Sequence, residues 1–338
     1  MVKMLMFDFR NTEKEYFKDN NELSDFDITF RKESLNRHTC LSDTEKSDTV
    51  ILSVFISSKI TEDVLNQFKN LQIIATRSSG YNHIDIEACR RKNIAVINVE
   101  SYGRTSVAQY TIGIILAMLR NVILSSNDIK NRRISYERYE GRDISKLSLG
   151  VIGTGAVGSA VCEIAYTLGM KIYAYDITVN KDINGLAEYI PFIELIKQSD
   201  IISLHVPYIK EFYHLISEKE FKEMKDGSYI INTARGELID TYALYNALKS
   251  GKIKGAALDV IEGESLISSA DDFDAALKSA SCECMENAII VQKLIGYDNV
   301  IITPHIAYNT TEAVRMILDM TFINIKNYFK GLHTSRIV

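Results

Sequence analysis

The chain has 338 residues, 46% of them hydrophobic and 25% charged, and its 39 basic and 44 acidic residues give a formal net charge of −5. This length exceeds that of a typical single domain, so we expect two domains, each with its own core. The charges show no basic run and no acidic block, which argues against a nucleic-acid partner.

The cysteines and the apolar stretches limit the compartment and exclude some classes of site. Cys282 and Cys284 form a C-x-C pair, but no second pair or nearby histidine completes a metal site, so we expect no metal. Asp8 interrupts the apolar start of the chain, which favours a first strand over a signal peptide. The longest apolar stretch, Ile112–Leu119, is too short to span a bilayer. We therefore expect a cytoplasmic protein with free thiols and no membrane partner.

Short β-rich apolar runs alternate with helical patterns along almost the whole chain. Strands are predicted at Lys3–Phe7, Thr49–Phe55, Gln72–Thr76, Ala95–Val99, Leu149–Ile152, Lys171–Tyr175, Ile201–His205, Tyr229–Asn232, Gly255–Val260 and Val300–Thr303. Helices are predicted at Thr61–Lys69, Thr105–Arg120, Ala156–Leu168, Phe192–Gln198, Thr241–Lys249 and Thr311–Lys330. A polar stretch, Asn127–Lys146, separates the strands before Glu100 from those after it. The pattern predicts an α/β fold of two doubly wound domains with parallel sheets.

A glycine-rich turn follows the strand predicted at Leu149–Ile152. The turn is Gly153-Thr154-Gly155-Ala156-Val157-Gly158, a helical pattern follows it, and a second strand ends at Asp176, 23 residues after Gly153. In this context the first glycine permits a tight turn, the second lets a pyrophosphate approach the backbone, and the third lets helix and strand pack closely. The helix N-terminus binds the phosphates. Asp176 is placed to accept hydrogen bonds from the ribose and to repel a 2′-phosphate, so we predict NAD as the cofactor.

Three other segments place polar residues at the ends of predicted strands, where doubly wound sheets bind ligands. They carry Arg235, Glu264 and His305. An arginine pairs bidentately with a substrate carboxylate, a histidine donates the proton that reduction of a keto group requires, and a carboxylate beside the imidazole favours its protonated form. Taken singly, each residue also fits a surface or structural role, and the segments around them decide between the two readings.

Those segments resemble the D-isomer-specific 2-hydroxyacid dehydrogenase family over nearly the whole chain, and within it the D-lactate dehydrogenases, including those of the vancomycin-resistance type. The matching stretches are Thr76–Asp85, Val151–Gly158, Ser203–Pro207, Ile231–Asp240, Gly255–Glu264 and Thr303–Ala307. The resemblance implies a Rossmann NAD domain, residues 102–305, inserted in a flavodoxin-like substrate domain, residues 1–101 and 306–338. It implies a site in the cleft between the two domains and a homodimer.

The resemblance also assigns roles to residues. Arg235 binds the substrate carboxylate, His305 is the general acid/base, and Glu264 is its partner. Further substrate contacts come from the backbone of Ser78, Ser79 and Gly80 and from Tyr102 and Tyr308. Besides Gly153, Thr154, Gly155, Ala156, Val157, Gly158 and Asp176, the cofactor contacts are His205, Val206 and Pro207 on the adenine side, and Thr233, Ala234 and Asp259 near the nicotinamide. Asp259 is expected to bond the carboxamide. The reaction implied is reduction of a small 2-keto acid, with pyruvate to D-lactate as the first hypothesis.

The chain departs from the family pattern near the expected pocket. Gly103-Arg104 replaces a common Ser-Pro after Tyr102, Gln109 replaces an acidic residue, and Ser265 replaces a proline. Arg104 is open to two interpretations: a second cation for a dicarboxylate substrate, or a residue that caps or solvates the start of a helix. Three alternatives to the first hypothesis therefore stay open. They are another 2-keto acid (2-ketoisocaproate, phenylpyruvate, oxaloacetate or hydroxypyruvate), an NAD-sensing scaffold, and a redox or metal protein that uses Cys282 and Cys284.

Overall fold

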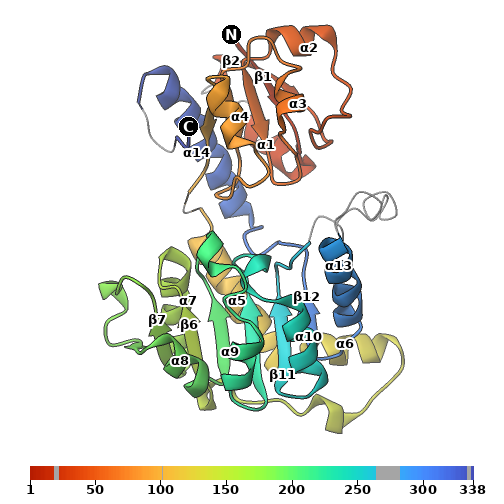
Figure 1. The fold of residues 1–338 in the computed structure, drawn as a ribbon, viewed down its shortest axis with the longest axis vertical. Coiled ribbons are helices and arrows are strands. Elements are labelled where there is room, and N and C mark those ends of the chain that lie inside the picture. Colours follow the sequence, from red (N-terminus) through yellow and green to blue (C-terminus); the bar gives the residue numbers. More distant parts are fainter. Residues whose placement is uncertain (19–22, 101, 264–281, 333–335) are drawn as a thin grey trace. The chain divides into compact units, whose positions relative to one another are not determined.

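The computed structural model describes residues 1–18, 23–100, 102–263, 282–332 and 336–338. The chain divides into two compact units, Met1–Tyr102 with Asn309–Val338 and Gly103–Tyr308 (Figure 1). They are called unit 1 and unit 2 below. Each unit is an α/β layer structure with a parallel sheet, so the predicted fold class is confirmed.

Unit 1 contains a five-stranded sheet in the order β2-β1-β3-β4-β5. Its strands are β1 (Val2–Met6), β2 (Phe26–Phe30), β3 (Ile51–Val54), β4 (Ile73–Thr76) and β5 (Ala95–Ile97). Its helices are α1 (Lys14–Phe17), α2 (Asp43–Asp48), α3 (Glu62–Leu65), α4 (Ile86–Arg91) and α14 (Thr311–Phe329). The order 2-1-3-4-5 is that of flavodoxin-like folds. Side chains of α3 and α4 pack on one face of the sheet and those of α14 on the other.

Unit 2 contains a seven-stranded sheet in the order β12-β11-β10-β9-β6-β7-β8. Its strands are β6 (Ser148–Ile152), β7 (Lys171–Tyr175), β8 (Glu188–Tyr189), β9 (Ile201–Leu204), β10 (Ser228–Asn232), β11 (Ile253–Leu258) and β12 (Val300–Ile302). Its helices are α5 (Arg104–Leu119), α6 (Val122–Lys130), α7 (Ala156–Thr167), α8 (Phe192–Gln198), α9 (Glu218–Glu223), α10 (Thr241–Lys249) and α13 (Cys282–Ile295). The strand order reverses between β6 and β9, the switch point at which such sheets bind ligands.

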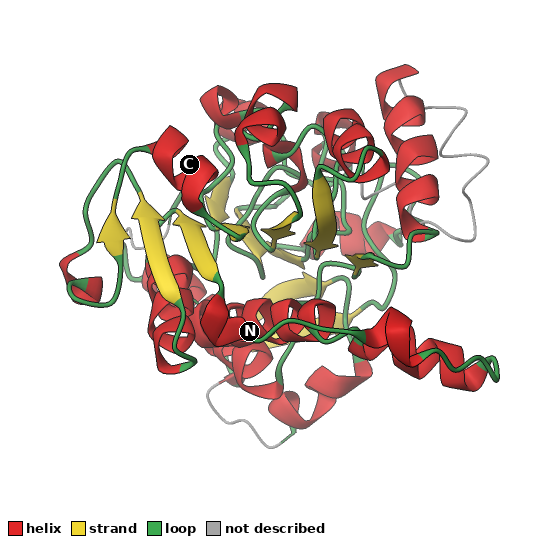
Figure 2. Ribbon diagram, turned by 90° about the horizontal axis from the view of Figure 1, so that it is seen from below, coloured by secondary structure: helices red, strands yellow, loops and turns green. Residues whose placement is uncertain are grey.

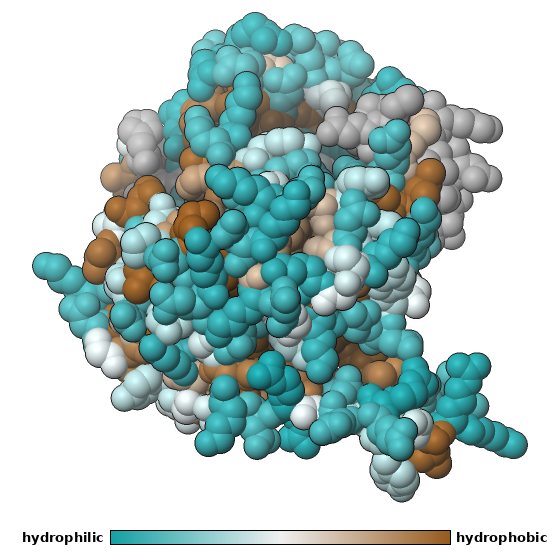
Figure 3. All heavy atoms as spheres, turned by 60° about the horizontal axis from the view of Figure 1, so that its bottom comes forward, coloured by the Kyte–Doolittle hydropathy of each residue, from teal (hydrophilic) through white to brown (hydrophobic). Residues whose placement is uncertain are grey.

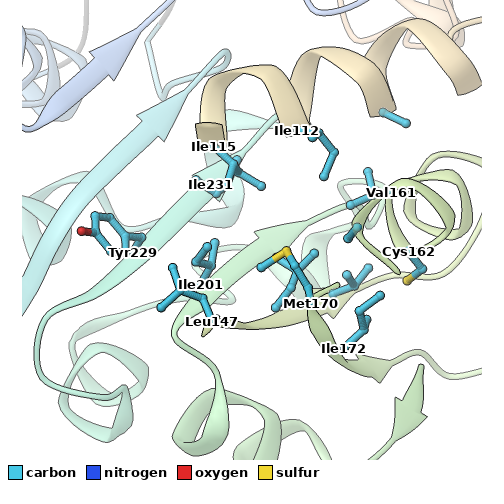
Figure 4. Packing of buried hydrophobic residues seen from close by; sticks show 14 of the residues in the cluster. Ile112, Ile115, Leu147, Val161, Cys162, Met170, Ile172, Ile201, Tyr229 and Ile231 are labelled. Atoms are coloured by element: carbon cyan, nitrogen blue, oxygen red, sulfur yellow. The ribbon is translucent and has the colours of Figure 1, made fainter. Parts of the chain in front are cut away.

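Helices cover both faces of the unit 2 sheet (Figure 2). On one face Ile112 and Ile115 of α5 and Val161 of α7 pack on the strand residues Ile201 and Ile231 (Figure 4). On the other face, α8, α9, α10 and α13 cover the sheet. This double cover explains why the central strands are apolar along their whole length rather than alternating.

Most predicted elements are present, with shifted ends. The predicted helix Thr61–Lys69 is shorter, since α3 ends at Leu65. Asp240 caps α10 by accepting a hydrogen bond from the Ala243 N–H. The sequence did not predict β2, β8 or α6, and α6 takes the first part of the polar stretch Asn127–Lys146.

Among the described residues, no single helix is long and apolar enough to cross a membrane. Only α5 and α6 taken together meet the length and composition criterion, and they are bent by 61° with respect to each other.

Candidate active site

The glycine-rich turn after β6 has the geometry that its sequence predicts. Gly153 has a φ of +93°, which favours glycine, and a Cβ there would lie 2.7 Å from the carbonyl carbon of His205. A Cβ at Gly158 would overlap the carbonyl oxygen of Gly153. Gly155 is the N-cap of α7, and a Cβ there would meet no atom within 4 Å. The open space at a helix N-terminus fits a phosphate group, so the turn fits a dinucleotide.

A chain of hydrogen bonds holds Asp176 at the end of β7. Its Oδ2 accepts from the backbone N–H of Thr154 (2.6 Å) and from the Thr154 hydroxyl (3.2 Å). That hydroxyl accepts from the Tyr189 hydroxyl (2.8 Å), which accepts from the N–H of Asn180 (2.9 Å). The donors all point along the chain toward the carboxylate, an arrangement in which each bond polarises the next. Asn180 and Tyr189 were not predicted as site residues, because neither belongs to a recognisable motif.

His205, Val206 and Pro207 follow β9, on the other side of the switch point. Nε2 of His205 lies 2.8 Å from the Ser203 hydroxyl, while Nδ1 is buried and has no partner among the described residues. Burial lowers the pKa of His205 to about 3, so the imidazole is neutral near pH 7. The backbone of His205 and the side chain of Val206 lie against Gly153. His205 and Val206 therefore border the glycine-rich turn, and Pro207 follows them in the chain.

Arg235 lies in a tightly held turn after β10. Oδ1 of Asn232 accepts from the Ala234 N–H (3.0 Å), and its Nδ2 donates to the Arg235 carbonyl (2.7 Å). The Thr233 hydroxyl lies 2.9 Å from that of Thr111 in α5. The Arg235 side chain is half-buried and donates to the Ala234 carbonyl (2.6 Å). The turn fixes the start of a side chain whose guanidinium is still partly accessible.

The next residue, Gly236, lies in close contact with the segment that follows β11. A Cβ at Gly236 would lie 2.6 Å from the N of Glu262 and still closer to the carbonyl group of Ile261. Glu262 itself is buried, with its carboxylate 2.8 Å from Nε2 of His214 and accepting from the Thr241 hydroxyl (2.7 Å). Gly236, Glu262 and His214 were not predicted from the sequence to have a role in the site. Glu264 lies outside the described residues.

Asp259, at the end of β11, holds the turn that contains His305. Its Oδ1 accepts from the Thr303 hydroxyl (2.6 Å) and the Ile306 N–H (3.0 Å), and its Oδ2 accepts from the Ala307 N–H (2.8 Å). The N–H of His305 donates to the Asp259 carbonyl (2.9 Å), and His305 has a φ of 53°. Burial raises the pKa of Asp259. The carboxylate that we expected beside the nicotinamide is thus engaged with the backbone around His305.

The predicted site residues fall into two groups, one in each unit. Unit 2 brings together the strand ends that carry Gly153, Asp176, His205, Arg235, Asp259 and His305, because its strands are all parallel. Tyr308, which is buried, belongs to the same unit. In unit 1, Ser78, Ser79 and Gly80 form the turn after β4. Tyr102, which is half-buried, is the last residue of the segment Met1–Tyr102 of that unit.

The structure also bears on Arg104 and on the pair Cys282 and Cys284, whose roles the sequence left open. The guanidinium of Arg104 forms an ion pair with Glu163 (2.8 Å), which joins α5 to α7 across the surface of unit 2. Cys282 and Cys284 lie in α13, and their side chains are outside the described part of the chain. Within the described residues, no cluster of histidine, cysteine and acidic side chains has the geometry to hold a metal ion.

Comparisons with known proteins agree with this geometry. Residues 112–307 match the family model described as D-isomer specific 2-hydroxyacid dehydrogenase, NAD binding domain. The chain is 38% identical over 279 residues to a D-specific alpha-keto acid dehydrogenase of Enterococcus faecium, and the match covers 82% of each protein. It is 35% identical over 280 residues to an aromatic 2-oxoacid reductase of Clostridium sporogenes, with 82% of each covered.

The structure is similar to that of D-lactate dehydrogenase from Aquifex aeolicus in complex with NAD and lactic acid. The TM-score is 0.83 at 34% sequence identity, with 97% of this chain and 96% of the other covered. The cofactor of this chain is NAD, as the glycine-rich turn and Asp176 predict.

Proposed function

This chain belongs to the D-isomer-specific 2-hydroxyacid dehydrogenase family, and we propose that it reduces pyruvate to D-lactate with NADH. One observation carries the proposal. The turns with Arg235 and His305 follow β10 and β12, and the segment after β11 between them is joined to one turn at Gly236 and to the other at Asp259. A carboxylate-binding cation and a proton donor are thereby held at one edge of the sheet that also carries the dinucleotide turn.

In this reaction a 2-keto acid, NADH and a proton give a D-2-hydroxy acid and NAD. NADH, when bound, supplies the hydride to the carbonyl carbon. Arg235 pairs bidentately with the substrate carboxylate and thereby orients the carbonyl. His305 donates the proton to the carbonyl oxygen, and Glu264 keeps the imidazole oriented and protonated for that step. In the direction of oxidation, His305 accepts the same proton.

The cofactor contacts are assigned from the same edge of the sheet. We assign the pyrophosphate to the turn Gly153–Gly158 and the adenosine ribose to Asp176. His205, Val206 and Pro207 border the adenine, and Thr233 and Ala234 border the nicotinamide. Asp259 has a second acceptor position left on Oδ2, which accepts only one bond from the described residues, and we assign it to the carboxamide.

We also assign substrate contacts to residues of unit 1. The backbone of Ser78, Ser79 and Gly80 is assigned to the substrate carboxylate, and Tyr102 and the buried Tyr308 are assigned to limit the size of the substrate. We accordingly assign unit 1 as the substrate domain and unit 2 as the NAD domain. Arg104 is the cation that could favour a dicarboxylate substrate, but its guanidinium is paired with Glu163. This pairing supports a substrate with one carboxylate.

A panel of 2-keto acids tests the substrate. Pyruvate, 2-ketoisocaproate, phenylpyruvate, oxaloacetate and hydroxypyruvate are compared by kcat/KM with NADH, and the chirality of each product is determined. We expect pyruvate to rank first and the product to be D-lactate. If phenylpyruvate ranks first, the chain is an aromatic 2-oxoacid reductase like its relative from Clostridium sporogenes. Tight NADH binding with no turnover of any acid would instead indicate an NAD-sensing scaffold.

Two variants test the assigned roles in the same assay. His305→Gln is expected to lower kcat by about 10²–10⁴-fold with little change in the Kd for NADH, because the proton donor is lost. Arg235→Lys is expected to raise the KM for the keto acid sharply, since a lysine cannot form the bidentate pair. Cys282→Ala together with a chelator serves as the control, and loss of activity there would indicate a redox or metal protein instead.

We further propose a homodimer that forms through unit 2. The apolar residues of the stretch Ile112–Leu119 that face inward are buried in the unit's own core. The segment that follows it exposes apolar side chains instead: Ile129 is 64% exposed, Ile134 68% and Tyr136 85%. Elsewhere, the face shown in Figure 3 carries hydrophobic groups scattered among polar ones. These three apolar side chains are exposed among charged neighbours, and the proposal is that a second subunit covers them.

Light scattering after size-exclusion chromatography measures the assembly directly. We expect twice the chain mass for the wild type and the chain mass for an Ile134→Asp, Tyr136→Asp double variant. A monomeric wild type would refute the proposed interface. We place the enzyme in the cytoplasm, a proposal supported by the free thiols of Cys40, Cys89 and Cys162.

A further inference from the structure

The turn after β4 in unit 1 is held by its carbonyl groups. The Ser78 carbonyl accepts from the Val99 N–H (3.1 Å), and the Ser79 carbonyl accepts from Nδ2 of Asn98 (3.0 Å). The Gly80 carbonyl accepts from the Ser78 hydroxyl (2.7 Å). Three consecutive carbonyl oxygens are thereby fixed to the protein itself, and this determines how the peptide groups between them are oriented.

The N–H groups of the same turn have no acceptor. Neither Ser79 nor Gly80 donates a backbone hydrogen bond to any residue that the structure describes. Ser79 is exposed and Gly80 is half-buried, so both N–H groups lie where a ligand can reach them. Successive backbone N–H groups with no protein acceptor form a binding place for an anion such as a carboxylate.

Asn98 is a buried residue whose side chain is bonded to the turn. It follows β5, is 3% exposed, and its Oδ1 is buried without a partner among the described residues. Burial of an unpaired amide oxygen is destabilising, and an apolar residue at this position would avoid it. We therefore attribute the presence of an asparagine here to the hydrogen bond that Nδ2 donates to the Ser79 carbonyl.

A second set of contacts fixes the start of the turn. The Thr76 hydroxyl lies 2.7 Å from that of Ser78 and 3.2 Å from Nε2 of His83. Arg77 is almost fully buried, and its guanidinium donates to the Phe7 carbonyl (2.8 Å) and to the Ser53 hydroxyl (2.9 Å). With its start fixed to β1 and β3, the turn retains freedom mainly at Ser79 and Gly80, and Asn98 removes that freedom.

We propose that Asn98 is a positioning residue for the carboxylate of the 2-keto acid. By holding the Ser79 carbonyl, it fixes the Ser79–Gly80 peptide and so turns the Gly80 N–H toward the substrate carboxylate, while the Val99 N–H fixes the peptide that carries the Ser79 N–H. The carboxylate accepts from both N–H groups. Hydrogen bonds to an ionised acceptor are strong and directional, so rotation of the Ser79–Gly80 peptide weakens substrate binding. The inference rests on the proposed reaction and adds a residue to it that does not touch the substrate.

The chain offers a closely matched control in Asn324 of α14. This residue is also buried, at 5% exposed, and its Nδ2 donates to a backbone carbonyl at 3.1 Å. The acceptor is the carbonyl of Asn98 itself rather than one of the turn. Asn98→Ala and Asn324→Ala therefore each remove one buried amide and one bond to the backbone of unit 1, and only Asn98→Ala frees the turn.

The test measures KM and kcat for the best keto acid, the Kd for NADH, and the Kd for oxamate in the NADH complex. For Asn98→Ala we expect KM and the oxamate Kd to rise about tenfold, with the NADH Kd changed less than twofold. For Asn324→Ala we expect all four within twofold of the wild type, although its melting temperature falls by a similar amount. If Asn98→Ala does not fold, Ser78→Ala takes its place, since it frees the Gly80 carbonyl, and the same selective rise in KM is expected.

The outcomes separate this inference from the proposed function. Wild-type turnover together with an unchanged KM in Asn98→Ala overturns the inference alone. An equal rise in KM in Asn324→Ala also overturns it, because the effect would then come from general loss of stability. Absence of turnover of every keto acid by the wild type refutes the proposed function, and the inference with it.

Discussion

A methyl group added at Gly236 tests whether the turn that carries Arg235 must contact the segment after β11. A Cβ built there lies 2.6 Å from the N of Glu262 and closer still to the carbonyl group of Ile261, whereas ordinary contacts begin at 3.4 Å. The neighbours are backbone atoms and have no rotamer to change. The Gly236→Ala variant therefore moves one of the two segments by about 1 Å.

This displacement sets the size of the expected effect. Overpacking of this kind destabilises a protein by about 1–3 kcal/mol. A misplacement of about 1 Å in a catalytic constellation costs about 10²-fold in rate, and Arg235 is the residue next to the methyl group. We therefore expect kcat/KM for the keto acid to fall about 10²-fold. The Kd for NADH should change little, because the dinucleotide turn follows β6, which lies two strands away from β10 in the sheet order.

Steady-state kinetics, NADH titration by fluorescence and thermal unfolding are measured on the same preparations. Gly150→Ala is the control: a Cβ at Gly150, in β6, would lie 2.6 Å from Cδ2 of Leu195 and overlap the Ser199 hydroxyl. This variant should lose comparable stability while kcat/KM stays within about threefold. A folded Gly236→Ala enzyme with wild-type kcat/KM would refute the coupling between the two segments.

Three further changes probe the network at other points. Tyr189→Phe removes the donor to the Thr154 hydroxyl, so the Kd for NADH should rise about fivefold and the preference over NADPH should narrow in a fluorescence titration. Asp259→Asn replaces one carboxylate oxygen with an NH2 group, which cannot accept from the backbone N–H groups of Ile306 and Ala307. We expect kcat to fall about 10–100-fold in steady-state assays, while the circular dichroism spectrum stays unchanged. Burial lowers the pKa of His83 from 6.5 to about 4, so between these values the unfolded chain binds a proton that the folded chain does not. The free energy of unfolding therefore falls as the pH falls through this window. Between pH 7 and pH 5, urea unfolding should show that His83→Gln loses about 2 kcal/mol less of this free energy than the wild type does. Equal losses in the two proteins would contradict the assignment.

The sequence predicted those parts of the structure that have a local signal. The central strands β6, β7, β9 and β10 are mostly apolar because both faces are covered, and their ends were predicted to within one residue. The long helices α5 and α14 were predicted as accurately, α14 because its apolar residues recur with the helical period and α5 because it is a long run without strand or turn signals. The dinucleotide turn was found for the same reason: its glycines are required by contacts within a single strand–turn–helix unit.

The missed elements lack such a signal. Strand β2, Phe26–Phe30, is an edge strand in which only Phe26 is buried, and it is defined by its register with β1, where Val2 pairs with Phe26. Strand β8 has two residues and exists only through its pairing with β7. Helix α6 begins one residue after a left-handed Asn121, and its polar sequence resembles a loop. In each case a distant segment or an unusual backbone angle decides the structure.

The candidate site divides in the same way. Residues expected to touch the ligand, such as Arg235 and His305, were found through motifs that cluster at strand ends. The residues that hold the site in place act on distant segments: Asn98 reaches a backbone carbonyl 19 positions earlier in the chain, and the Thr111 hydroxyl pairs with the hydroxyl of a residue 122 positions later. A side chain that bonds a backbone carbonyl requires no particular residue type at the other end, so no pairwise pattern marks it in the sequence. Such residues become visible only when the three-dimensional contacts are known, and they are therefore where substitutions at a distance from the substrate should alter substrate binding.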